Sequence, residues 1–176
     1  MELTSREIWT VLHGMVFGAI YLLAFAGALA ELYSLSPFSD TRMGISKSLQ
    51  RLRVGTWTMT AIAWLTVISG TWAVYIWYRA TPVPGVDLSH FPKFFLLSST
   101  HTNDWHNFGM EWKEHIVWIV PFVMTSIAFT VQRHGDQIVR NEILRKSLMA
   151  LLIISFSAGG IAALLGAFIN KAAATH

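Results

Sequence analysis

Long runs of apolar residues, separated by short polar segments, form the main pattern of this chain. The hydrocarbon core of a bilayer is about 30 Å thick, so a helix needs about 20 apolar residues to cross it. Four segments reach that length, at 8–32, 54–78, 112–131 and 144–169. The pattern predicts an all-α integral membrane protein, a four-transmembrane-helix bundle whose single membrane domain covers residues 1–176.

The polar segments predict how the helices are oriented. Basic residues concentrate in two of them, at about 34–53 and 132–146, and short basic loops remain in the cytoplasm. Both termini and the segment at about 79–111 are then predicted to lie outside, with the protein in a bacterial inner (cytoplasmic) membrane. The basic residues concerned are Arg42, Lys47, Arg51, Arg53, Arg133, Arg140, Arg145 and Lys146.

The predicted outer loop at 79–111 is too long to be a simple connection between neighbouring helices. Its stretch DLSHFPKFFLL is rich in aromatic and aliphatic residues, which predicts a structured loop that lies on the bilayer surface or under a partner. Tryptophans also gather towards this side, so we expect other subunits of a membrane complex to dock on the outer loop. These tryptophans are Trp9, Trp72, Trp77, Trp105 and Trp112.

Composition supports the membrane interpretation and excludes several kinds of site. The chain is 53% hydrophobic and 13% charged, whereas about a quarter of the residues in a soluble domain are charged. It has no cysteine, which excludes disulfides, iron–sulfur clusters, thiolate metal sites and covalently attached haem. The net charge of +3 comes from basic residues in separate loops, so the chain is not expected to bind nucleic acid.

Two histidines, His13 and His115, fall within the predicted membrane helices. Each lies four or five residues from the outer end of its helix, about 6 to 8 Å deep at a rise of 1.5 Å per residue. Because the first and third helices run in the same direction, the two imidazoles are expected at the same depth. Polar side chains within a membrane usually face the bundle interior and serve function.

A b-type haem with two histidine ligands requires imidazoles on facing helices, small residues near a ligand, apolar walls and basic groups for its propionates. This sequence offers a candidate for each requirement. The candidates are His13 and His115 as ligands of the haem iron, Gly14 and Gly18 for room, Phe17, Trp118 and Phe122 for walls, and Arg79 and Lys113 for propionates.

In its four spans and two histidines, the arrangement is similar to that of four-helix membrane b-type cytochromes. The resemblance implies one haem b near the outer face, a possible quinone, and electron relay between the quinone pool and an external redox partner. The chain would then be a non-catalytic electron-transfer subunit of a respiratory-chain oxidoreductase complex. The inner half offers His134 as its histidine, which gives little basis for a second haem.

Two alternatives remain open from the sequence. The chain can be a cofactor-free membrane anchor or assembly subunit of a larger complex, with His13 and His115 hydrogen-bonded inside the protein. It can instead hold a non-haem metal, because carboxylates and imidazoles lie close together before and within the third span. That candidate set is Asp104, His106, Glu111 and His115, while His90 and His101 are expected to be ordinary loop residues outside any site.

Overall fold

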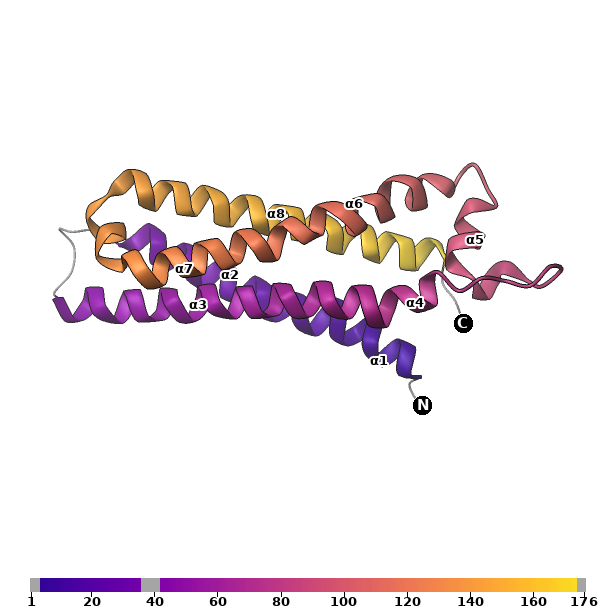
Figure 1. Cartoon of the computed structure of the whole chain (residues 1–176), viewed down its shortest axis with the longest axis horizontal. Helices are drawn as coiled ribbons and strands as arrows, with labels where there is room; N and C mark the ends of the chain where they lie inside the picture. Colours follow the sequence, from indigo (N-terminus) through magenta and orange to yellow (C-terminus); the bar gives the residue numbers. More distant parts are fainter. Residues whose placement is uncertain (1–3, 36–41, 174–176) are drawn as a thin grey trace. The chain divides into compact units, whose positions relative to one another are not determined.

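The structure is a computed structural model that describes residues 4–35 and 42–173. Within these ranges every regular element is helical, and four helical segments are long and apolar enough to cross a membrane (Figure 1). They are Ser5–Ser34, Arg42–Tyr78, Trp105–Arg140 and Glu142–Ala172, called here the first to fourth spans. The predictions of an all-helical fold and of four helices long and apolar enough to span a membrane are confirmed.

All four helical segments extend beyond the apolar runs that predicted them. The second begins at Arg42, where the sequence predicted residue 54, and the third begins at Trp105, where it predicted 112. Only Asn141 separates α7 from α8, so the predicted loop at 132–146 is almost entirely helical. Hydropathy measures the length of chain that fits the hydrocarbon, whereas a helix can continue through polar residues into the headgroup region and water.

Three of the spans are interrupted by turns of a different helix type. The first contains α1 (Ser5–Val11), the π-helical turn η1 (Leu12–Val16) and α2 (Phe17–Ser34). The second contains α3 (Arg42–Ser69), the π-helical turn η2 (Gly70–Val74) and α4 (Tyr75–Tyr78). The third contains the π-helical turn η4 (Trp105–Met110), α6 (Glu111–His115), the 3₁₀ turn η5 (Ile116–Trp118) and α7 (Ile119–Arg140), and the fourth is α8 (Glu142–Ala172).

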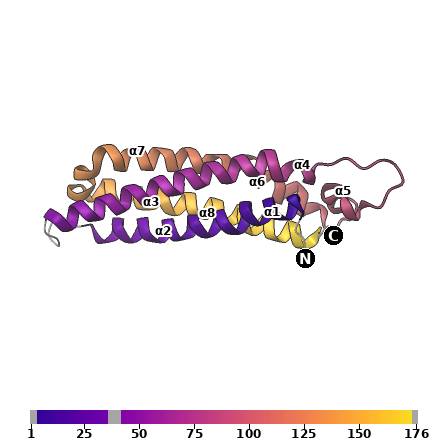
Figure 2. The same ribbon diagram turned by 90° about the horizontal axis from the view of Figure 1, so that it is seen from below.

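The chain divides into two compact units, each built from pieces of all four spans. The first unit takes the residues up to Gly18, then Leu65–Trp118, and those from Ala158 onward; the second takes Ala19–Trp64 and Ile119–Ser157. The described ends of the chain, at α1 and at the end of α8, both belong to the first unit and lie at the same end of it (Figures 1 and 2). The prediction that residues 1–176 form a single domain stays a prediction.

The segment between the second and third spans is ordered and anchored to the first unit. It contains the 3₁₀ turn η3 (Leu88–His90) and α5 (Pro92–Leu97). Hydrogen bonds from the side chain and backbone of Ser89 hold the pKa of Asp87, which caps η3, below its ordinary value.

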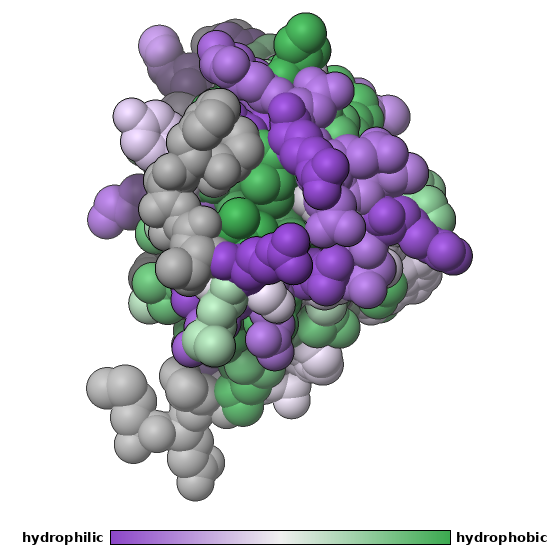
Figure 3. Space-filling view, turned by 90° about the vertical axis from the view of Figure 1, so that its left-hand side faces the viewer, coloured by the Kyte–Doolittle hydropathy of each residue, from purple (hydrophilic) through white to green (hydrophobic). Residues whose placement is uncertain are grey.

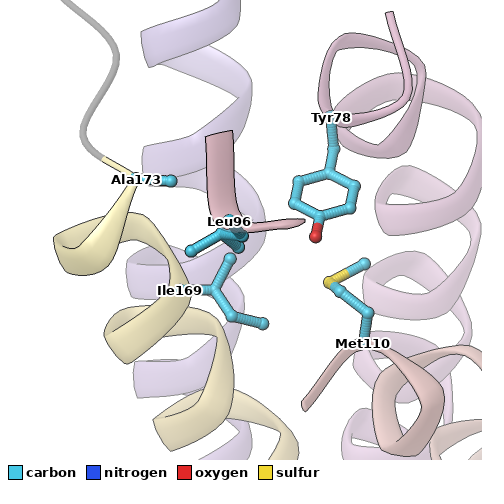
Figure 4. Close-up of a cluster of buried hydrophobic side chains, with 5 residues drawn as sticks. All are labelled: Tyr78, Leu96, Met110, Ile169 and Ala173. Carbon is cyan, nitrogen blue, oxygen red and sulfur yellow. The ribbon is translucent and has the colours of Figure 1, made fainter. Parts of the chain in front are cut away.

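Leu96 is fully buried beside Ile169 in a cluster that joins α5 to three spans (Figure 4). Its members are Tyr78, Leu96, Met110, Ile169 and Ala173.

In the second unit the helices are joined by close backbone approach, aromatic stacking and hydrogen bonds. A Cβ at Gly55 on α3 would lie 3.5 Å from Cβ of Ala28 on α2, so these two helices are in close contact. Phe25 of α2 stacks on Phe156 of α8 with ring centroids 3.9 Å apart. The indole nitrogen of Trp64 on α3 donates to the hydroxyl of Thr125 on α7 at 3.1 Å.

Candidate functional site

The residues that the sequence proposed for a cofactor belong to the first unit, with the exception of Phe122. Phe122 lies in the second unit, where its ring packs edge-on against Trp64 at 5.1 Å between centroids. The candidates in the first unit are His13, His115, Gly14, Gly18, Phe17, Trp118, Arg79 and Lys113.

His13 lies in the π-helical turn of the first span and points at the corresponding turn of the second. Its Nδ1 is 3.1 Å from the hydroxyl of Ser69, and that hydroxyl donates to the Thr66 carbonyl at 3.2 Å. In the tautomer that donates from Nδ1–H of His13 to the Ser69 oxygen, Nε2 keeps an unprotonated lone pair.

Gly70 is required for this position of the His13 ring. A Cβ built on Gly70 would lie 2.7 Å from Cε1 of His13 and 3.4 Å from each ring nitrogen. Real Cβ atoms do not approach a neighbour that closely, so the imidazole can pack here only because residue 70 has no side chain. Ser69 and Gly70 together fix both the hydrogen bond and the position of the ring.

His115 is held by its own helix. Its Nδ1 lies 3.0 Å from the Glu111 carbonyl and 3.3 Å from the Glu111 carboxylate, and about two thirds of its side chain (68%) is exposed. Since a carbonyl can only accept, Nδ1 carries the proton and Nε2 again keeps its lone pair. The described contacts place His13 against the second span and His115 against Glu111, and they do not join the two imidazoles.

Lys113 extends from α6 towards the fourth span. Its Nζ occupies the space beside Gly166, only 2.6 Å from where a Cβ of residue 166 would lie, and its charge is close enough to act on the His13 imidazole. Within the described residues, no carboxylate lies within 4.0 Å of this ammonium group. An ammonium group among apolar helices without a counter-charge is costly, which makes this position suitable for an anionic ligand.

The other candidates differ in how they are placed. A Cβ at Gly14 or Gly18 would meet nothing within 4 Å among the described residues, so this side of the first span is open. Trp118 packs edge-on against Trp72, with ring centroids 6.2 Å apart at 90°. The Arg79 guanidinium is exposed and lies 5.1 Å from the centre of the Tyr75 ring. Phe17 is half-buried.

Comparison of the chain with protein-family models, with curated proteins and with solved structures gives no match. Similarity to known proteins therefore assigns neither a family nor a residue role. The candidate chemistry rests on the side chains of the first unit.

Sequence reasoning missed two tyrosines that hold acid–base groups in the first unit. The Tyr75 hydroxyl donates to the Glu114 carboxylate, and the Tyr78 hydroxyl lies 2.8 Å from Nδ1 of His106. The two phenol rings stack at 6.0 Å between centroids. Their spacing of three residues near the end of the second span was visible in the sequence, but their partners, 28 and 39 residues away, were not.

The proposed non-haem metal set is not assembled. In the described ranges, no three histidine, aspartate or glutamate side chains come together as a metal-binding group. The placement of His106 also differs from the predicted outer loop at 79–111, because the third helical segment begins at Trp105. His106 is bonded to Tyr78, His115 faces Glu111 and Asp104 is exposed, so the structure gives this alternative no support.

Proposed function

We propose that this chain is a membrane subunit of a respiratory-type electron-transfer complex, with one b-type haem held in the first unit through His13 and His115. The observation that carries the proposal is the Lys113 ammonium, which lies beside Gly166 and has no carboxylate within 4.0 Å among the described residues. A haem brings two propionate carboxylates, and one of them would supply the missing counter-charge. Lys113 would then meet a propionate from inside the first unit, and the exposed Arg79 remains a candidate for the other.

The two candidate ligands have the protonation pattern that haem ligation requires. Iron binds the unprotonated imidazole nitrogen while the other ring nitrogen donates to a neighbouring oxygen. His13 donates to Ser69 and His115 to the Glu111 carbonyl, so both offer Nε2. The open side of the first span at Gly14 and Gly18 has room for a flat ligand. When bound, the haem supplies a one-electron carrier.

A quinol is the proposed electron donor or acceptor in the membrane. Its oxidation to a quinone releases two electrons, which leave one at a time, and two protons, which need acceptors. Two acid–base groups of the first unit are hydrogen-bonded to phenol hydroxyls. The Glu114 carboxylate is bonded in this way to Tyr75, and the His106 imidazole to Tyr78. Both groups lie in the third helical segment, which also carries the candidate ligand His115. These pairs are the proposed proton acceptors.

We propose the orientation predicted by the basic residues, with α5 outside and the turn between α7 and α8 in the cytoplasm of a bacterial inner membrane. The termini themselves, residues 1–3 and 174–176, lie outside the described residues. Large apolar side chains are exposed in the segment between the second and third spans, where a partner subunit would cover them. They are Val83, Val86, Phe95 and Leu97.

The visible spectrum of the purified protein tests the haem. After dithionite reduction we expect the α band of a b-type haem, and His13→Ala or His115→Ala should remove it or reduce it severalfold. His90→Ala and His101→Ala are matched controls, because these two histidines lie in the segment between the spans and should leave the band unchanged.

An α band that survives both His13→Ala and His115→Ala would show that the ligand assignment is wrong. A wild-type protein that binds no haem when purified in mild detergent with haem supplied would reject the cofactor itself. Circular dichroism of each variant separates a lost ligand from a lost fold, since a folded variant keeps its helical signal.

The second candidate function is a cofactor-free membrane anchor of a larger complex. The exposed apolar side chains at Phe95 and Leu97 favour it, because such residues in a segment between spans are typical of a docking surface. An anchor would copurify with its partner subunits and show no haem band. Phe95→Asp should then release the partner while the helical content stays unchanged.

A further inference from the structure

The second unit contains a groove that the proposed electron-transfer role does not use. It has a volume of about 440 Å³ and lies between the beginning of α3 and the last turns of α7. Figure 3 looks onto this end of the unit, where hydrophilic side chains gather beside hydrophobic ones. Leu49 and Val139 are apolar residues of the groove, and its charged residues are Arg42, Arg53, Asp136 and Arg140.

The charges of this groove are unbalanced. Three guanidinium groups face one carboxylate, and within the described residues none of the three arginines forms an ion pair within 4.0 Å. By contrast, Arg51 on the same helix is paired with Glu31, and Arg145 donates to the Ile138 and Val139 carbonyls at the end of α7. Among the residues that the structure describes, the groove therefore has more positive than negative charge.

Arg53 distinguishes the groove from ordinary basic residues at a cytoplasmic helix end. Its Nε is buried without a hydrogen-bond partner in the described structure, which is costly for a charged donor. One of its terminal nitrogens, Nη2, lies 3.1 Å from where a Cβ on Gly135 would be, so a glycine in α7 makes room for the guanidinium. The Arg53 side chain is half-buried, and its Nε is a part that water does not reach.

From this geometry we propose that the groove binds a phosphate group, with a phosphodiester of an anionic phospholipid or free phosphate as its source. Guanidinium groups match phosphate in charge and in paired donor geometry, and basic pockets between membrane helices bind anionic headgroups. The apolar residues Leu49 and Val139 suit the glycerol end of a lipid. The proposal does not depend on haem binding.

Native mass spectrometry of the protein in detergent tests the proposal by comparing how much phosphatidylglycerol and how much phosphatidylcholine the protein retains. We expect retention of phosphatidylglycerol over phosphatidylcholine, and Arg140→Gln should weaken it about tenfold by removing a charge-assisted contact. Arg133→Gln is the matched control, because Arg133 lies on the same helix outside the groove, over the Phe129 ring. Asp136→Asn should strengthen binding, since it removes the carboxylate that lines the groove within the described ranges.

Equal losses from Arg140→Gln and Arg133→Gln would overturn the proposal, because they would indicate general surface charge. Absence of selective binding by wild type to either phosphatidylglycerol or inorganic phosphate would also overturn it. Inorganic phosphate is then added as a competitor of the lipid. If it displaces phosphatidylglycerol from wild type, and displaces less of it from Arg140→Gln, free phosphate is a ligand of the same groove. Arg140 is exposed, so its substitution tests the groove even if Arg53→Gln does not fold.

Discussion

Two glycines of the first unit show how one residue type serves opposite purposes. Gly70 is pressed against the His13 ring, whereas a side chain at Gly14 would enter open space. Both lie in π-helical turns, in the second and first spans respectively. Residue 70 therefore determines the position of the candidate ligand, and residue 14 leaves room beside it.

Gly70→Ala should destabilise the protein by about 1–3 kcal/mol, because the added methyl overpacks the His13 ring. The ring cannot simply turn away, since Ser69 holds its Nδ1. The unfolding midpoint in a detergent-denaturant titration measures the effect. We also expect the variant to bind less haem when haem is supplied.

Gly14→Ala is the control for this substitution. The new methyl meets no described atom within 4 Å, and alanine favours a helix over glycine by up to about 1 kcal/mol. Its stability should be unchanged or higher. If Gly14→Ala and Gly70→Ala had equal effects on stability, the contact between residue 70 and the His13 ring could not be the cause of the destabilisation.

At the scale of elements, the π-helical turns and the anchored α5 helix belong to the same unit. A π-helical turn widens the helix locally and often occurs at functional sites. Here such turns carry His13, Gly70 and His106, the residues around which the candidate chemistry is built. The α5 helix is attached to this unit through a single buried leucine and its neighbours.

Leu96→Ala should release α5 from the first unit. Leu96 is 0% exposed, and removing a fully buried leucine side chain costs about 2–5 kcal/mol. Limited proteolysis should then cut the segment 79–104 faster than in wild type. Leu97→Ala is the matched control, because its neighbouring side chain is 41% exposed and should leave the cleavage rate nearly unchanged.

At the scale of the whole molecule, the proposed topology puts the segment containing α5 outside the membrane and the turn between α7 and α8 in the cytoplasm. It rests on α6 and α7 belonging to one helical segment that is long and apolar enough to cross a membrane. Which side is cytoplasmic depends on the basic residues. The proposed orientation puts arginines of α3, α7 and α8 in the cytoplasm.

Single cysteines test this orientation, because the chain has none of its own. In intact bacterial cells with a permeabilised outer membrane, a membrane-impermeant maleimide should label His90→Cys. It should label Gln137→Cys only after the inner membrane is opened. Both positions are exposed on the protein surface, so labelling depends only on the side of the membrane on which each cysteine lies. The reverse pattern of labelling would invert the proposed topology.

Much of the fold was predictable from the sequence, whereas the helix ends were not. Apolar length predicts a span because the bilayer imposes it, and all four spans were predicted. The extension of the third span back to Trp105 was missed, because polar residues such as His106 and Asn107 give no hydropathy signal for a helix. The spacing of four residues between Glu111 and His115 is visible in the sequence, and in the structure these two side chains lie together on one helical face.

The sequence by itself determined that the chain has four helices long and apolar enough to cross a membrane and that His13 and His115 lie within two of them, because hydrophobic length and helical rise depend on local chain geometry. Only the tertiary structure decided what each side chain meets. It placed His13 against Ser69 and Gly70, turned Lys113 towards Gly166, and joined Tyr78 to His106. Such contacts depend on how separate helices rotate and pack against one another, and residue spacing within one helix does not determine that.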